Sequence, residues 1–203
     1  MRNGIIITVL FACLIGSSLL FYAGWELIIV GLLCVLFAFL YTTGPYPLSY
    51  NGWGDILVIV FFGFVPVGGT YYVQALTWTT DTTIASLICG LLIDTLLVVN
   101  NYRDREADAR SGKRTVIVRF GEKFGSYLYL MLGMTASLLC FWFLFEGHLY
   151  AALLPLLYLI PHFLTWKRMV RIHSGKKLNS ILGETSRNML LMGILLSIGF
   201  FLN

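Results

Sequence analysis

Long apolar runs separated by short polar stretches follow one another along the whole chain. The pattern predicts seven membrane-spanning helices, at residues 5–21, 27–41, 56–73, 84–99, 125–145, 150–166 and 188–202. Several runs are shorter than the roughly 20 residues that a perpendicular span needs, so we expect their ends to extend into flanking aromatic residues. We therefore expect an all-α, polytopic transmembrane helical bundle, and we treat residues 1–203 as one domain.

The composition excludes an ordinary soluble domain. Hydrophobic residues make up 58% of the chain and charged residues 12%, and the mean hydropathy is +0.82. A soluble domain of this size cannot bury so many apolar side chains in its interior. The four cysteines lie within apolar runs without metal-ligand spacing, so we interpret them as small buried hydrophobes. We expect membrane lipid as the surroundings and no nucleic-acid partner.

The basic residues fall on one side of the predicted bundle. All 14 Lys and Arg residues lie before the first span, after the fourth or after the sixth, whereas Glu26, Asp81 and Glu146 lie in the opposite connections. Cytoplasmic loops carry the excess of Lys and Arg. We therefore expect a protein of the cell (inner) membrane, with its amino terminus and charged loops in the cytoplasm and its carboxyl terminus outside.

Two other segments stand out. The uncharged stretch YTTGPYPLSYNGWG, residues 41–54, is rich in Gly, Pro and aromatic residues. It is interpreted either as an interfacial aromatic belt with turns or as a cap over a lipid-facing cavity. Gly63, Pro66 and the pair Gly68 and Gly69 interrupt the third span, which indicates close helix packing or a kink.

A dense island of charge, residues 100–119, follows the fourth span. Asp104 and Asp108 are four residues apart, so they share one face of a helix that continues from this span, with Asn100 and Asn101 a turn earlier. Two carboxylates beside amide oxygens suit Mg²⁺, which takes its remaining ligands from water and phosphate. Basic residues that could neutralise a phosphate group stand alongside, namely Arg103, Lys113 and Arg114. A solvated helix end with local ion pairs is the alternative.

Asp94 is an acid inside the fourth apolar run, seven residues before Asn101 and about 10 Å deeper on the same helix face. Intramembrane carboxylates usually face a bundle interior or a cavity. Asp94 is therefore either a hydrogen-bonded structural acid or a substrate-binding residue. In a transporter, a third possibility for this chain, it would be the coupling acid.

The segment NNYRDREADARSGKRTVIVRFG resembles the second aspartate-rich motif of the UbiA superfamily of membrane prenyltransferases, in the form of its 1,4-dihydroxy-2-naphthoate branch. The segment YTTGPYPLSYNGWGDILVIVFFGFVPVGGTYY is similar to an earlier segment of the same branch. The likeness extends over essentially the whole chain in span order.

The resemblance implies a nine-span bundle in which two aspartate-rich motifs hold Mg²⁺ and the diphosphate of a polyprenyl donor. The polyprenyl group is transferred to 1,4-dihydroxy-2-naphthoate with loss of CO₂ and diphosphate, giving demethylmenaquinone. By the same resemblance Asp104 and Asp108 are Mg²⁺ ligands. The substrate-binding residues are Asn100, Asn101, Arg103, Lys113 and Arg114, with Asp94 a further candidate.

The chain departs from the family at its start. The first aspartate-rich motif, of the form Asn-Asp-x-x-Asp, is absent from this sequence. We therefore expect the chain to lack the first two spans together with that motif, and to show little transferase activity as it stands. The alternative is a catalytically inactive homologue that binds quinone, lipid or a membrane partner.

Overall fold

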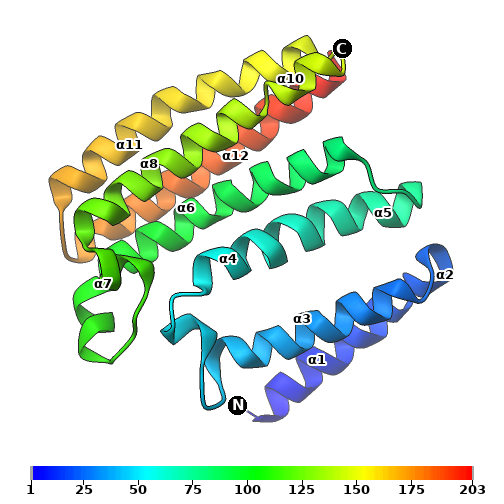
Figure 1. The fold of residues 1–203 in the computed structure, drawn as a ribbon, viewed down its shortest axis with the longest axis horizontal. Coiled ribbons are helices and arrows are strands. Elements are labelled where there is room, and N and C mark those ends of the chain that lie inside the picture. Colours follow the sequence, from blue (N-terminus) through cyan, green and yellow to red (C-terminus); the bar gives the residue numbers. More distant parts are fainter. Residues whose placement is uncertain (1, 203) are drawn as a thin grey trace.

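Seven helical segments make up the part of the chain that the computed structural model describes, residues 2–202 (Figure 1). Six of these segments are long and apolar enough to cross a membrane, and the seventh, α3, has 17 residues. The predicted helical bundle is confirmed. In chain order the elements are α1 (Arg2–Ser17), α2 (Leu20–Ala23), α3 (Glu26–Thr42), η1 (Leu48–Tyr50), α4 (Gly54–Val58), the π-helical η2 (Ile59–Gly68), α5 (Gly69–Ala75), α6 (Thr80–Arg110), α7 (Val116–Phe120), α8 (Glu122–Leu139), α9 (Trp142–Phe145), α10 (Leu149–Leu153), η3 (Leu154–Tyr158), α11 (Leu159–Ile172), η4 (Lys176–Leu178) and α12 (Asn179–Phe201).

Helix α6 lies in the middle of the bundle, between the α4–α5 segment and the helices α8 and α12 (Figure 1). In its apolar window 56% of the residues are buried, against 0% in the first span. The largest fully buried side chains surround α6 and its partners and include Ile88, Val98, Val99, Ile117, Tyr129, Phe143, Tyr158, Met169, Ile181 and Met192. Helices α1 and α3 instead expose most of their apolar side chains. An exposed apolar surface of this extent belongs in lipid, so the chain is an integral membrane protein.

Glycines bring the third segment into close contact with α6. A Cβ atom on Gly63 would lie 2.5 Å from the carbonyl oxygen of Ser86 and 2.8 Å from the Cα of Gly90. The same crossing places Gly90 against the backbone of Ile59. Pro66 lies within the π-helical η2, where the backbone departs from ordinary α-helix geometry. The interruption predicted from glycine and proline is therefore a close helix crossing combined with a change of helix type.

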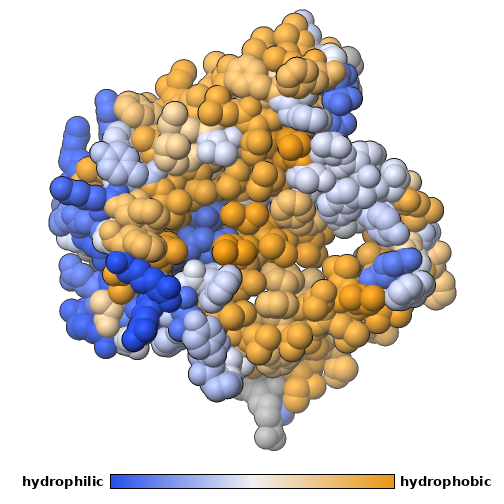
Figure 2. All heavy atoms as spheres, in the orientation of Figure 1, coloured by the Kyte–Doolittle hydropathy of each residue, from blue (hydrophilic) through white to orange (hydrophobic). Residues whose placement is uncertain are grey.

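The hydrophilic residues gather at one end of the bundle, around α7 (Figure 2). This end holds the carboxyl ends of α3, α6 and α11 and the start of α8 and α12 (Figure 1). The arrangement agrees with the one-sided distribution of charge, although the Arg2 side chain lies outside the described part. The side of the membrane that this end faces stays a prediction.

Several helices extend beyond the spans predicted from hydropathy, and α6 and α12 do so furthest. Helix α6 runs from Thr80 to Arg110 instead of residues 84–99, and α12 begins at Asn179 instead of Asn188. Hydropathy marks where a segment leaves lipid, whereas a helix continues until its backbone turns. The turns come at Gly112 and Gly175, which have φ values of +80° and +85° that favour glycine.

Candidate functional site

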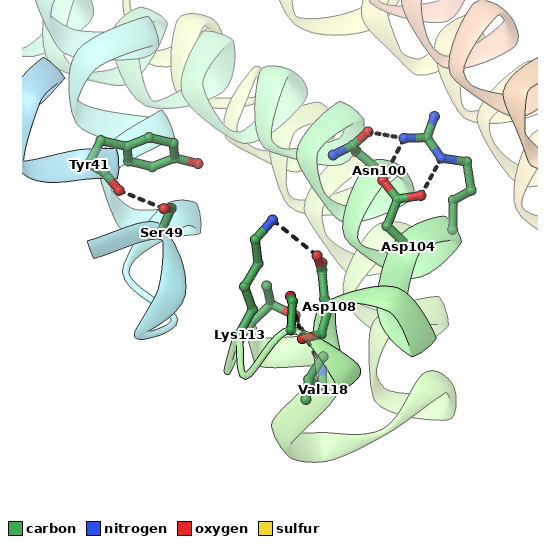
Figure 3. A network of polar contacts seen from close by, with 10 residues as sticks. Tyr41, Ser49, Asn100, Asp104, Asp108, Lys113 and Val118 are labelled. Carbon is green, nitrogen blue, oxygen red and sulfur yellow. Dashed lines mark hydrogen bonds and ion pairs between the residues drawn. The ribbon is translucent and has the colours of Figure 1, made fainter. Parts of the chain in front are cut away.

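The charge island begins on the last turns of α6, beyond its apolar part, and continues after Arg110 through a turn into α7. Asn100, Asp104 and Asp108 follow one another at a spacing of four residues, which places them on one face of the continuous helix (Figure 3). After the helix ends, the backbone N–H of Lys113 donates to the carbonyl oxygen of Asp108 over 2.9 Å. This turn brings the chain back toward the same face. The predicted continuation of the fourth span is confirmed.

A fork of hydrogen bonds from Arg103 holds the first aspartate. The Arg103 Nε donates to Asp104 Oδ1 over 2.7 Å, and Nη2 contacts Asp104 Oδ2 at 2.6 Å. The same guanidinium donates to Asn100 Oδ1 over 2.7 Å and to Asn179 Oδ1 on α12 over 3.0 Å. Planar bidentate pairing of this kind fixes both side chains. Asp104 therefore faces a cation supplied by the chain itself.

The second aspartate is paired with Lys113. The Lys113 Nζ lies 3.0 Å from Asp108 Oδ1, and Asp108 is buried. The hydrogen bond to Asp108 is the main reason that the pKa of Lys113 is raised above its usual range. The ammonium group also lies 5.4 Å from the centre of the Tyr50 ring. Lys113 thus connects the motif on α6 to the segment that precedes α4.

That segment, residues 43–53 and here called the aromatic loop, is docked on the charged residues. The backbone N–H of Arg114 donates to the Tyr50 carbonyl oxygen over 2.7 Å, and Arg119 Nη2 donates to the Asn51 carbonyl oxygen over 2.7 Å. Gly52 has a φ of +81°, and a Cβ there would lie 2.9 Å from the Arg114 carbonyl oxygen. Of the two interpretations of this stretch, the contacts favour a cap more than an aromatic belt.

A polar pocket of about 420 Å³ lies beneath the aromatic loop and beside α6. In Figure 3 Tyr41 lies on one side, Asn100 lies across from it, and Lys113 extends between the two. The structure thus brings Asn100, Asn101 and Lys113 into one pocket, with Asp104 and Asp108 next to it on α6. The lining residues are Tyr41, Thr42, Ser49, Tyr50, Gly52, Gly54, Asp55, Leu97, Asn100, Asn101, Lys113 and Thr115.

An apolar groove of about 520 Å³ adjoins this pocket at Tyr41, which lines both. The groove runs between α3 and the α4–η2 segment. Its other lining residues are Cys34, Phe37, Ala38, Leu57, Val58, Phe61 and Phe62. The site therefore offers polar and basic groups at the charged end of the bundle and aromatic and aliphatic groups deeper in.

The sequence interpretation missed Asp55, the second residue of α4. It lines the polar pocket, and its Oδ1 atom is buried without a hydrogen-bond partner in the described structure. The Oδ1 atom of Asp94, a residue that is 1% exposed, is also buried without a hydrogen-bond partner in the described structure. Asp94 is therefore a buried acid whose Oδ1 has no hydrogen-bond partner among the described residues, and its role, structural or substrate-binding, stays a prediction. An acid at the start of an apolar span was the signal that could have identified Asp55.

The donor set for a divalent cation is incomplete within residues 2–202. No group of three or more His, Cys, Asp or Glu side chains gathers in this part of the chain. Asp104 and Asp108 with the nearby asparagine amides still provide hard oxygen ligands. Mg²⁺ commonly takes one or two carboxylates and completes its shell with water and phosphate. The residues present therefore fit one part of a magnesium–phosphate site.

Comparison with known proteins gives one consistent result. The model of the UbiA prenyltransferase family matches residues 2–200. The 1,4-dihydroxy-2-naphthoate octaprenyltransferase of Escherichia coli is 33% identical over 100% of this chain and 68% of the relative. The enzyme of the same name from Haemophilus influenzae is 33% identical over 92% of this chain and 59% of the relative. That of Mycobacterium tuberculosis is 43% identical over 59% and 40%, respectively. No solved structure shows a significant match.

Proposed function

Because this chain belongs to the UbiA prenyltransferase family, a family of membrane enzymes, we propose that it transfers a polyprenyl group from polyprenyl diphosphate to 1,4-dihydroxy-2-naphthoate. The relatives that carry this activity in their names are longer than the chain, which spans 68% of one and 59% of another. The activity of the whole protein is therefore part of the proposal.

The observation that carries the proposal is that the polar pocket and the apolar groove meet at Tyr41. A polyprenyl diphosphate has an anionic head and a long apolar tail. The head fits the pocket at the charged end of the bundle, where Lys113 and Asn100 are available. The tail fits the groove, which is lined by Phe37, Phe61 and their neighbours and leads toward lipid.

The basic residues would bind the diphosphate by changing partners. Arg103 and Lys113 now neutralise Asp104 and Asp108. In our proposal both cations turn to phosphate oxygens, and Arg114 adds a third positive charge. The freed carboxylates Asp104 and Asp108 would hold Mg²⁺, with Asn100 and Asn101 beside them. The ion supplies charge neutralisation on the diphosphate.

These groups stabilise the negative charge that develops as the donor ionises. The bond between the prenyl C1 and the diphosphate oxygen breaks, and the diphosphate leaves with the bonding electrons. The carboxylate-bearing ring carbon of the acceptor forms the new carbon–carbon bond. Its carboxylate then leaves as CO₂, and the electrons of that bond restore the aromatic ring. The product is the hydroquinone form of demethylmenaquinone.

A second candidate function follows from the ion pairs. Each carboxylate of the motif is already neutralised by a neighbouring base, and no third acid gathers with them in residues 2–202. A chain with this arrangement could bind an isoprenoid quinone or lipid in the groove without catalysing transfer. The two candidates differ in their dependence on Asp104 and Asp108.

The test is prenyl transfer by the purified chain in lipid vesicles with Mg²⁺, a polyprenyl diphosphate and 1,4-dihydroxy-2-naphthoate. We expect Mg²⁺-dependent product with release of CO₂, and its loss in Asp104→Asn and Asp108→Asn. Glu106→Gln is the matched control, because Glu106 is exposed on another face of α6. Absence of product from the unaltered chain would favour the binding protein. Product at the normal rate from both aspartate variants would refute the metal assignment.

We further propose that the charged end of the bundle faces the cytoplasm, because it carries the Lys and Arg residues. Lys177 lies in η4, just before the start of α12 at this end, and Glu146 lies between α9 and α10 at the other end (Figure 1), so Lys177→Cys and Glu146→Cys place thiols at opposite ends. A membrane-impermeant maleimide applied to intact cells should label Glu146→Cys only. Labelling of Lys177→Cys alone would reverse the orientation.

A further inference from the structure

Two aspartates lie on neighbouring helices at the polar pocket: Asp55 lines it, and Asp94 lies on α6 three residues before the lining residue Leu97. Helix α4 runs antiparallel to α6 and packs against it (Figure 1). A Cβ on Gly54 would lie 3.3 Å from Leu97, and Gly90, farther back on α6, meets the segment after α4. This register places the first turn of α4, which carries Asp55, opposite the part of α6 that carries Asp94.

Neither carboxyl is fully satisfied by its surroundings. The Oδ1 atoms of Asp55 and Asp94 are both buried and accept no hydrogen bond from any described residue. Asp94 is 1% exposed, so bulk water does not replace the missing donor. Buried polar atoms are almost always hydrogen-bonded, and those that are not require an explanation. Two such atoms on helices that pack together, one of them on a residue that lines a pocket, indicate a place where a ligand supplies the donors.

The size and the lining of the pocket indicate the chemistry of this ligand. The pocket has a volume of about 420 Å³, which accommodates a bicyclic aromatic ring system. Leu97 and Tyr41 provide apolar and aromatic surface, and a Cβ on Gly54 would lie 3.5 Å from the Tyr41 hydroxyl oxygen. In either protonation state a carboxyl group keeps an oxygen that accepts a hydrogen bond. The complementary ligand is therefore flat, apolar and equipped with hydroxyl donors.

We propose that Asp55 and Asp94 form the binding site for the ring hydroxyl groups of an aromatic diol. Asp55 lines the pocket and accepts a hydrogen bond from the ligand hydroxyl. Asp94 lies one turn deeper than Leu97 on α6 and acts as a positioning residue that orients the Asp55 carboxyl. The proposal rests on the proposed function only for the identity of the diol, which is the acceptor of the transferred group.

This site differs from the charge island in what it recognises. Asp104 and Asp108 are paired with bases and face the anionic donor. Among the described ion pairs, none involves Asp55 or Asp94. The multiply charged diphosphate of the donor is repelled by these two acids, whereas the ring hydroxyl groups of the acceptor donate hydrogen bonds to them. In this proposal the diphosphate head of the donor lies at the charged end of the pocket. The acceptor ring lies deeper in the same pocket, next to Asp55.

The test measures binding of two probes to the purified chain in nanodiscs by calorimetry. 1,4-Naphthohydroquinone carries two hydroxyl donors, and 1,4-dimethoxynaphthalene has the same ring without them. We expect the diol to bind about tenfold tighter or more, because a hydrogen bond to a charged acceptor has this order of effect. Asp55→Leu and Asp94→Leu should remove most of this preference, and Asp55→Glu should retain it. Glu106→Leu is the control and should leave it unchanged.

Thermal unfolding of the same variants without ligand gives an independent readout. A carboxyl with a structural role stabilises the fold, so its replacement by leucine would lower the unfolding midpoint. A carboxyl that binds a ligand leaves a buried acceptor without a partner in the ligand-free protein, and this destabilises the fold. Asp55→Leu and Asp94→Leu should therefore unfold at the same temperature as the unaltered chain or at a higher one. If either leucine variant fails to fold, Asp55→Asn and Asp94→Asn replace it in the binding test. Their preference for the diol should fall, because a neutral amide oxygen is a weaker acceptor than a carboxylate, and an unchanged preference would overturn the inference.

The outcomes also separate this inference from the proposed function. An unaltered chain that binds both probes equally would overturn the inference, even if it transfers prenyl groups. Preference for the diol that persists in both leucine variants would overturn it as well. A chain that transfers nothing but loses its diol preference in Asp55→Leu would support the inference and refute the transferase proposal.

Discussion

Replacement of Gly63 by alanine tests whether the close crossing of η2 and α6 is essential to the fold. In the native packing the added methyl carbon would lie 2.5 Å from the Ser86 carbonyl oxygen and 2.8 Å from the Gly90 Cα. These are about 0.5 Å and 0.2 Å inside the 3.0 Å limit below which Cβ contacts are essentially never found. Both neighbours are backbone atoms, so no side-chain rotation can relieve the contact.

The two helices must therefore move apart, which typically costs about 1–3 kcal/mol in a close-packed interior. Gly69→Ala is the matched control in the same span, because its Cβ would meet nothing within 4 Å. Both substitutions restrict the unfolded chain equally and gain about 0.4–1 kcal/mol from it. The difference between the two variants thus isolates the crossing. A difference of about 2 kcal/mol corresponds to roughly 4–8 °C in a protein of this size.

The assay is thermal unfolding of the two variants and the unaltered chain in the same detergent, followed by the loss of monodisperse protein. We expect Gly63→Ala to unfold several degrees below Gly69→Ala. Diol binding should weaken in Gly63→Ala alone, because the moving helices carry Asp55 and Asp94. Equal midpoints for the two alanine variants would show that the crossing tolerates expansion, and our account of this segment would then be wrong.

Two further predictions concern other parts of the structure. Gly133→Ala would bring a methyl carbon against the His162 ring, which is held between two tyrosines, so it should destabilise the chain by about 1–3 kcal/mol. Gly193→Ala, which meets nothing within 4 Å, should not. The pKa of Lys113 is raised chiefly by its hydrogen bond to Asp108, so the stability from this pair is present below the usual lysine range and is lost as the pH rises through the raised pKa. Chemical denaturation at increasing pH should show the deficit of Lys113→Met shrinking above that range, and a constant deficit would contradict the ion pair.

The helices and the face of the motif could be predicted from the sequence because both follow from local periodicity. Lipid requires long apolar helices, and a spacing of four residues places Asn100, Asp104 and Asp108 in line on any helix. The helix ends could not be predicted from hydropathy. Charged residues leave the bilayer without ending a helix, and α6 therefore continues to Arg110.

The contacts between distant segments were beyond sequence reasoning. Asp55 becomes part of the site only because α4 pairs with α6 in one register, and a single sequence does not specify that register. The partner of Arg103 on α12 is 76 residues away. The docking of the aromatic loop depends on backbone groups such as the Tyr50 carbonyl oxygen, which every residue type has. Composition indicates an ordered loop, but it does not identify the surface that the loop contacts.

The guanidinium of Arg103 joins three side chains on two helices, and this shared bonding makes occupancy of the site detectable at a distance. Its four hydrogen bonds hold Asn100 and Asp104 on α6 and Asn179 at the start of α12. An anion that draws Arg103 away from Asp104 also competes with its bond to Asn179 and so loosens the attachment of α12. A spectroscopic label on the exposed Ser180 would then report filling of a pocket that the label itself does not touch.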